Sequence, residues 1–128
     1  MNNFYMILAP ISIGELVDKI TILEIKKERI TGDKLNHINN ELNYLQEVFE
    51  NNNLEIDKLI LTTLKQVNMN LWDIENEIRI KEQKNEFDQD FIDLARSVYK
   101  KNDKRASLKK EINLKYGSML VEEKSYKC

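Results

Sequence analysis

Residues that make turns are scarce in this chain, which has three glycines and one proline among 128 residues. A β-sandwich or β-barrel needs a turn every few residues and usually draws on these two residue types, so the scarcity argues against both folds. Hydrophobic residues make up 41% of the chain and charged residues 33%, a balance that suits a helical protein with one modest core. We therefore expect an all-α fold in a single domain that spans residues 1–128.

Cysteine is nearly absent as well, because Cys128 stands alone. This excludes an internal disulfide and a cysteine-based zinc site. No segment approaches the roughly 20 apolar residues of a membrane-spanning helix. The apolar run 4–9 is shorter than the core of a signal peptide, and no basic residue precedes it. The net charge of −2 favours no class of partner. We expect a cytoplasmic protein without a membrane contact.

Sequence motifs of catalysis and cofactor binding are missing too. The chain contains no glycine-rich phosphate loop, no H-E-x-x-H and no G-x-S-x-G. Its single histidine, His37, has no neighbours that would complete a triad or a ligand set. Glu24 and Glu28 lie one helical turn apart, but two carboxylates without further acids are a weak metal signal. We expect no metal and no cofactor, and the sequence disfavours an enzyme.

Hydrophobic residues recur at alternating spacings of three and four, the pattern of coiled-coil-like helices that pack on one another. The expected helices cover residues 12–31, 33–51, 54–83 and 88–116. The last two are long, the first two are short, and the brief connection between the long pair makes them antiparallel neighbours. This predicts an antiparallel bundle of about four helices. A short extended N-terminal arm should lie on the bundle, and the C-terminal tail 118–128 receives no assignment.

Helix-capping residues support these boundaries. Ser12 begins an S-x-x-E capping box at the first helix, and Gly32 suits a left-handed stop after it. Asn52 or Asn53 can cap the third helix and Asp88 the fourth. The first helix is apolar on more than one side, which is typical of a central helix or of a subunit interface. Some of its charged residues would then point inward and be paired.

The fourth helix has the clearest irregularity. Its seam is the row of residues, spaced three and four apart, that packs against other helices, and two adjacent positions of this seam are cationic. The seam consists of Phe91, Leu94, Val98, Lys101, Arg105, Leu108 and Ile112. Either the helix leaves its partners at the cations, or a polar layer lies inside the bundle. A guanidinium suits a carboxylate or a phosphate, whereas a buried ion pair or amide network would fix the helix register. The candidate ligand-binding residues are Arg96, Tyr99, Lys101, Asn102, Arg105, Asn68 and Asp73.

The same helix is rich in positive charge, with seven cations and two anions among residues 100–115. A basic helix can follow the phosphates of a nucleic acid. This one has no interleaved aromatic residues past Tyr99, and cations also suit the C-terminal half of a helix. A solvated face is therefore the preferred interpretation, and nucleic acid is not an expected partner.

Four segments resemble a small family of bacterial and phage proteins that is known as a domain of unknown function. They are SIGELVDKITILEIKKERI (12–30), LWDIENEIR (71–79), FIDLARSVYKKNDKRASLKKEIN (91–113) and EEKSY (122–126). The shared motifs read SxGELxDKITIL, LARSVYxxND and EEKSY. The resemblance covers most of the chain except the second helix and the segment after it. It implies no activity and no catalytic residues.

A weaker similarity links LVDKITILEIKKERI (16–30) to the first helix of the helical chorismate mutases. Both have an acidic residue followed by an apolar run and an arginine. That family implies an enzyme that holds a dicarboxylate with cations from different helices. The corresponding cations here would be Arg29, Arg96, Lys101 and Arg105.

Two functional interpretations remain. The continuous seams, the apolar first helix and the missing catalytic motifs favour a non-enzymatic helical module that binds a second copy of itself, as a dimer, or another protein. The alternative is an all-α enzyme or a protein that binds a small anion, carboxylate or phosphate, at the polar layer of the fourth helix. A concave pocket lined by Arg96, Tyr99, Asn102 and Arg105 would favour the alternative, and a dry, paired layer would favour the module.

Overall fold

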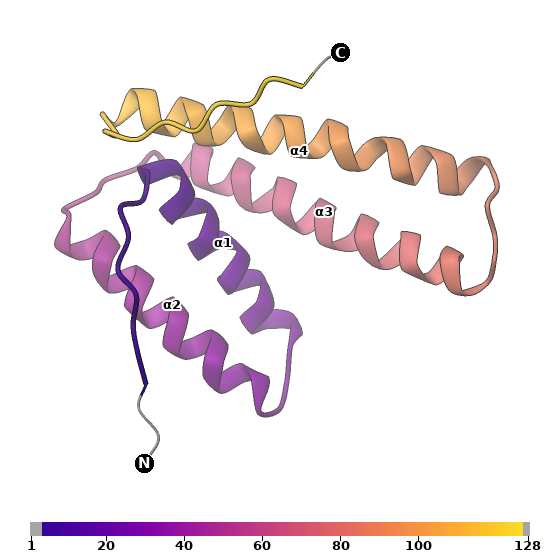
Figure 1. The fold of residues 1–128 in the computed structure, drawn as a ribbon, viewed down its shortest axis with the longest axis horizontal. Coiled ribbons are helices and arrows are strands. Elements are labelled where there is room, and N and C mark those ends of the chain that lie inside the picture. The colour runs from indigo at the N-terminus through magenta and orange to yellow at the C-terminus, as the bar shows by residue number, and fades with distance from the viewer. Residues whose placement is uncertain (1–3, 127–128) are drawn as a thin grey trace.

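The computed structural model describes residues 4–126 and consists of two antiparallel helical hairpins (Figure 1). The first joins α1 (Ile13–Arg29) to α2 (Lys34–Asn51), which are 17 and 18 residues long. The second joins α3 (Lys58–Gln83) to α4 (Gln89–Lys115), which are 26 and 27 residues long. The described residues contain no strand. The prediction of an all-α bundle with two short and two long helices is confirmed.

α1 is the central helix of this arrangement. It packs against α2, α3 and α4, whereas α2 packs against no helix except α1. Its buried residues include Val17, Leu23 and Ile25, which explains why the sequence is apolar on more than one side. The α3–α4 hairpin extends beyond α1 at one end (Figure 1). None of the helices in the described chain combines the length and apolar character that crossing a membrane requires.

Two apolar clusters meet at α1. The first joins α1 to α3, α4 and the α2–α3 connection, and its buried members are Val17, Ile56, Leu64 and Ile112. The second joins α1 to α2, and its buried members are Leu23, Ile38 and Leu42. Both clusters depend on α1, so the two hairpins are held together through this helix.

The caps of α1 and α4 form as the sequence predicts. The Ser12 hydroxyl accepts a hydrogen bond from the backbone N–H of Glu15 at 3.0 Å, and Asp88 accepts one from that of Phe91 at 3.0 Å. Gly32 follows α1 in the left-handed conformation, with φ at +83°. The capping box is closed on one side only, because the Glu15 carboxylate pairs with Lys109 of α4.

The predicted start of the third helix is wrong, since α3 begins at Lys58 and not near Leu54. Asn53 ends the preceding segment in the left-handed region (φ +52°), which asparagine tolerates better than most residues. Ile56 is buried in the core between the helices. Asp57 then caps α3 by accepting a hydrogen bond from the Leu59 N–H at 2.8 Å.

The N-terminal arm, residues 4–11, has no helix or strand, and it does not lie on the bundle as predicted. Phe4, Tyr5, Ile7 and Leu8 are 86–93% exposed. The arm runs past α2 as an irregular trace (Figure 1). Its apolar side chains therefore gain nothing from the core of their own chain.

The C-terminal tail runs back along α4 (Figure 1). Lys110 pairs with Glu123 at 3.0 Å, and Lys124 pairs with Asp103 at 2.8 Å. Glu122 accepts a hydrogen bond from the Ser12 hydroxyl. The EEKSY segment thereby fastens the tail both to α4 and to the start of α1.

Asp88 also stabilises the tip of the α3–α4 hairpin. Its carboxylate accepts the Phe91 N–H and pairs with the Lys81 ammonium at 3.0 Å. The backbone hydrogen bond from Phe91, and then the hydrogen bond from Lys81, lower the pKa of Asp88. The same hydrogen bond raises the pKa of Lys81. A carboxyl group whose pKa is lower in the folded state adds stability above its unfolded pKa, and that stability is lost as pH falls through the folded pKa.

We therefore expect Asp88→Ala to lower the melting temperature at neutral pH, and the difference from wild type to shrink on acidification to about pH 2. Asp88→Asn should behave as an intermediate, because asparagine keeps a cap but loses the ion pair. Thermal melts followed by circular dichroism across this pH range measure both differences. A wild-type advantage over Asp88→Ala that stays constant down to pH 2 would contradict the role of the charge.

Candidate functional site

A buried polar layer joins α1, α3 and α4 at the predicted gap in the α4 seam. Asp18 of α1 is fully buried. The Nε atom of Arg105 lies 3.0 and 3.1 Å from its two carboxylate oxygens, and Nη2 donates a further hydrogen bond. Asn68 of α3 donates its amide to Asp18 at 2.9 Å and to the Thr21 hydroxyl at 2.8 Å. Thr21 in turn donates to the Asp18 carbonyl at 2.8 Å. The carboxylate of α1 thus accepts hydrogen bonds from two other helices, α3 and α4.

Lys109 adds a second cation to this layer. Its ammonium pairs with Glu15 and lies 3.8 Å from the Asp18 carboxylate. Two cations from α4 therefore face two carboxylates from α1, and the layer is neutral as a whole. The hydrogen bond to Asp18 is the main cause that raises the pKa of Arg105 above its ordinary value. Arg105 is committed to this ion pair as a permanent cation.

A glycine permits the close approach of α1 and α4 that the layer needs. The Gly14 N–H donates to the Asn113 side-chain oxygen at 2.6 Å, and both residues are buried. A Cβ atom at position 14 would lie 2.5 Å from the Lys109 carbonyl oxygen, which leaves no room for any other residue. One turn further along α1, Asp18 meets Arg105 across the same contact.

Asn102 and Arg105 line two hollows that adjoin the layer. The first has a volume of 390 Å³ and lies between α4 and the C-terminal tail, with Tyr99 and Lys109 in its wall. The second has a volume of 450 Å³ and lies where α1 diverges from the α3–α4 hairpin. The cations of the first hollow are Arg105, Lys109 and Lys124, and each is paired with a carboxylate. The hollow therefore offers an anion no uncompensated positive charge.

The predicted candidates fall into separate groups. Asn68 and Arg105 lie together in the polar layer, and Tyr99 and Asn102 line the hollow beside it. Arg96 is exposed and lines neither hollow.

The remaining two candidates lie outside the layer. Lys101 is half-buried in the seam and forms no ion pair with any residue from 4 to 126. Asp73 is exposed and accepts a hydrogen bond from Arg29 at 2.7 Å.

The candidate residues predicted from the sequence do not include the counter-ion Asp18 or the small residues around it. Gly14, Asp18, Thr21 and Ile25 recur at spacings of four, three and four along α1, so they share one face. All four are buried. In the sequence, this row of small and polar residues on one face of an otherwise apolar helix indicates the polar layer.

Glu24 and Glu28, the pair considered for a metal ion, face Lys65 of α3. The ammonium lies 3.9 Å from Glu24 and 3.3 Å from Glu28. Within the described chain, no three histidine, cysteine, aspartate or glutamate side chains gather in a way that could hold a metal ion. The two carboxylates act as the anionic side of an ion pair between α1 and α3.

Comparison with other proteins confirms that the chain resembles a family of unknown function. Residues 7–128 match the sequence profile of a family described as a family of unknown function, DUF6165. No curated protein and no solved structure matches the chain. The matched region includes all four helices, the polar layer and the tail. The chain therefore belongs to the DUF6165 family of unknown function.

Proposed function

We propose that the protein is a non-enzymatic assembly module that binds a second copy of itself through the distal hairpin, residues 71–98. The observation that carries this proposal is the burial pattern of α3 and α4. No residue from 69 to 111 is buried, although the apolar spacing of both helices continues through this region. The buried residues of the two helices are confined to positions 64–68 and 112–113, where α1 covers them.

The distal seam is apolar but only half covered. It consists of Leu71, Ile74, Ile78, Phe91, Leu94 and Val98, which are all partly exposed. Two helices cannot enclose a seam of this kind by themselves, and helical bundles usually complete it with a third and fourth helix. A second hairpin supplies both helices at once, and a two-fold axis lets each copy use the same surface.

The charges along α4 suit such a two-fold contact. Asp90 and Asp93 lie at the tip of the hairpin, and Lys100 and Lys101 lie nearer its base. An antiparallel pairing of two α4 helices brings the acidic end of each copy opposite the basic end of the other. Lys101, which has no ion pair within the described chain, would gain a carboxylate partner in this contact.

The alternative of an anion-binding protein or enzyme has less support from the geometry. Arg105 and Lys109 are neutralised by Asp18 and Glu15, and Arg29 is paired with Asp73. A neutral, hydrogen-bonded layer of this type fixes the register and approach of helices. We assign Asn68 and Arg105 to that structural role.

Leu94→Asp tests the proposal, with Ala95→Asp as its matched control. Both changes place an aspartate in the same turn of α4, but Leu94 is a seam residue and Ala95 is exposed. We expect light scattering at one concentration to give the same oligomer mass for wild type and Ala95→Asp, and a lower mass for Leu94→Asp, whose helical circular dichroism should be retained.

A wild type that is monomeric at every concentration would contradict the proposal. Thermal melts of the wild type with and without phosphate or a small dicarboxylate test the anion-binding alternative. Stabilisation of the wild type by these anions would support the anion-binding alternative.

A further inference from the structure

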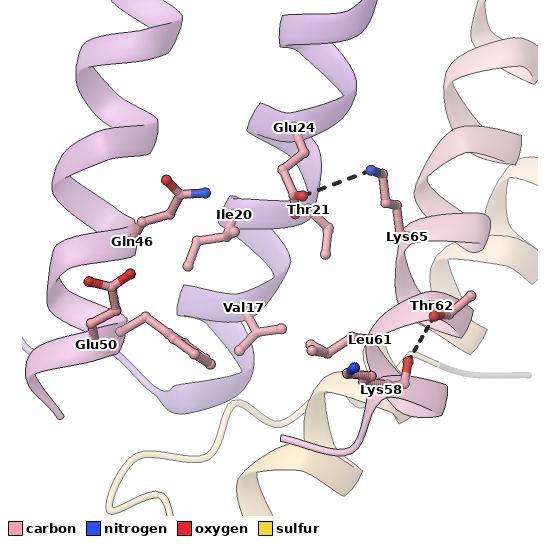
Figure 2. Close-up of a pocket in the computed structure, with 11 residues that line it drawn as sticks. Val17, Ile20, Thr21, Glu24, Gln46, Glu50, Lys58, Leu61, Thr62 and Lys65 are labelled. Atoms are coloured by element: carbon pink, nitrogen blue, oxygen red, sulfur yellow. Dashed lines mark hydrogen bonds and ion pairs between the residues drawn. The ribbon is translucent and has the colours of Figure 1, made fainter. Parts of the chain in front are cut away.

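A groove beside the polar layer, with Thr21 in its lining, has no occupant among residues 4–126. α1 forms its floor, and α2 and α3 form its walls, because these two helices do not pack against each other. Figure 2 shows Val17, Ile20 and Thr21 of α1 between α2 and α3, with Leu61 of α3 opposite Val17. The groove has a volume of 530 Å³. On the floor, Val17 and Thr21 are buried and Ile20 is partly exposed.

The rim of the groove carries no net charge. Two carboxylates, Glu24 and Glu50, face two ammonium groups, Lys58 and Lys65. Glu24 and Lys65 lie 3.9 Å apart. A groove with balanced charge and with Val17, Ile20 and Leu61 in its lining suits an uncharged, apolar segment better than an ionic ligand.

The same chain contains such a segment without a place to bind. Residues 4–8, Phe-Tyr-Met-Ile-Leu, have no charge, and each of their side chains is more than half exposed. Monomeric proteins seldom expose a contiguous apolar patch of this kind. Pro10 fixes an extended backbone at the base of the arm and biases Ala9 toward the same conformation. The arm leaves the start of α1 and runs past α2 with its apolar side chains exposed (Figure 1).

We propose that residues 4–8 of one copy bind in the groove between α2 and α3 of a second copy. Five extended residues span about 17 Å, and the groove follows α1 and α3 for two turns, about 11 Å. Side chains of an extended segment alternate in direction, so Phe4, Met6 and Leu8 share one face of the segment and Tyr5 and Ile7 share the other.

The area of this contact is sufficient for a stable interface. An aromatic side chain such as Phe4 or Tyr5 buries roughly 150–250 Å². Two exchanged arms and the two grooves that receive them would together reach the roughly 1,200–2,000 Å² of a stable interface. This contact is separate from the distal hairpin and does not require it.

Disulfide trapping between two different chains tests the proposal. Both chains carry Cys128→Ser, one carries Leu8→Cys in the arm, and the other carries Gln46→Cys at the rim of the groove. Under mild oxidation we expect a covalent dimer that contains one chain of each type. The control replaces Gln46→Cys with Lys84→Cys, at an exposed position of the hairpin tip. The yield with Gln46→Cys should be about tenfold higher than with this control. Adding Tyr5→Asp and Ile7→Asp to the arm chain should abolish this excess.

Three results would overturn the proposal. They are equal trapping at positions 46 and 84, no effect of the two aspartates, and a doubly substituted single chain that closes its disulfide within itself.

The same trapping experiment in chains that also carry Leu94→Asp separates this contact from the distal hairpin. Trapping that persists there while the light-scattering result fails would refute only the proposed hairpin dimer. If the yield at position 46 does not exceed the control while Leu94→Asp still lowers the mass in light scattering, only the arm contact is refuted.

Discussion

Replacing Arg105 with methionine should lower the free energy of unfolding by about 3–4 kcal/mol. Methionine keeps most of the aliphatic volume of the arginine, so the loss reflects the charge and its hydrogen bonds. Asp18 would remain fully buried, with the Asn68 amide and a Lys109 ammonium at 3.8 Å as its remaining partners. Breaking one side of a buried ion pair is costly because the other charge is left uncompensated. Lys109 keeps the expected loss in the lower part of the usual range.

A double-mutant cycle assigns this loss to the Asp18 pair. Asp18→Asn removes the charge but keeps an oxygen that can accept the Asn68 hydrogen bond. Arg105→Met should therefore cost much less in the Asp18→Asn background than in wild type. Lys104→Met, a change at a neighbouring exposed cation, should stay within about 0.5 kcal/mol of wild type.

Urea unfolding followed by circular dichroism measures all four variants. Equal costs for Arg105→Met in the two backgrounds would show that the ion pair does not account for the loss.

The sequence predicted the position of this layer but not its counter-ion. The spacing along α4 places Lys101 and Arg105 on the inward seam, and the short hairpin connection places Asn68 level with them. These are relations within one hairpin, which spacing and loop length determine. Asp18 lies 87 residues from Arg105. Its position depends on how α1 crosses the hairpin, and no local pattern in α4 encodes that crossing.

Spacing also cannot distinguish a seam that is buried from one that is half exposed. Leu64 and Leu94 are both seam residues of the α3–α4 hairpin, but only Leu64 is buried. The start of α3 shows a similar dependence on tertiary contacts. The backbone N–H of Asp57 donates to the Tyr116 hydroxyl at 2.8 Å, and this contact with the end of α4 helps to place the cap. Sequence spacing alone does not contain this contact, and it therefore favours the asparagines at 52 and 53 as caps.

Gly14→Ala should destabilise the protein by about 2–3 kcal/mol, although alanine is the better helix former by about 1 kcal/mol. The added methyl group would lie 2.5 Å from the Lys109 carbonyl oxygen. That oxygen belongs to the backbone of α4, so the contact can be relieved only if α1 and α4 move apart. Such a movement would also strain the 2.6 Å hydrogen bond from Gly14 to Asn113 and the Asp18–Arg105 pair one turn away.

Gly32→Ala is the matched control for this change. Gly32 has φ at +83° and open space around the position of a Cβ atom, so its replacement measures conformational strain without a clash, about 1 kcal/mol. Urea unfolding of both variants compares the two costs. If the two helices are held as close as the structure has them, Gly14→Ala also weakens the coupling between Asp18 and Arg105 in the double-mutant cycle. A Gly14→Ala protein that is more stable than wild type, as helix propensity alone predicts, would mean that α1 and α4 have room to separate without cost to the polar layer.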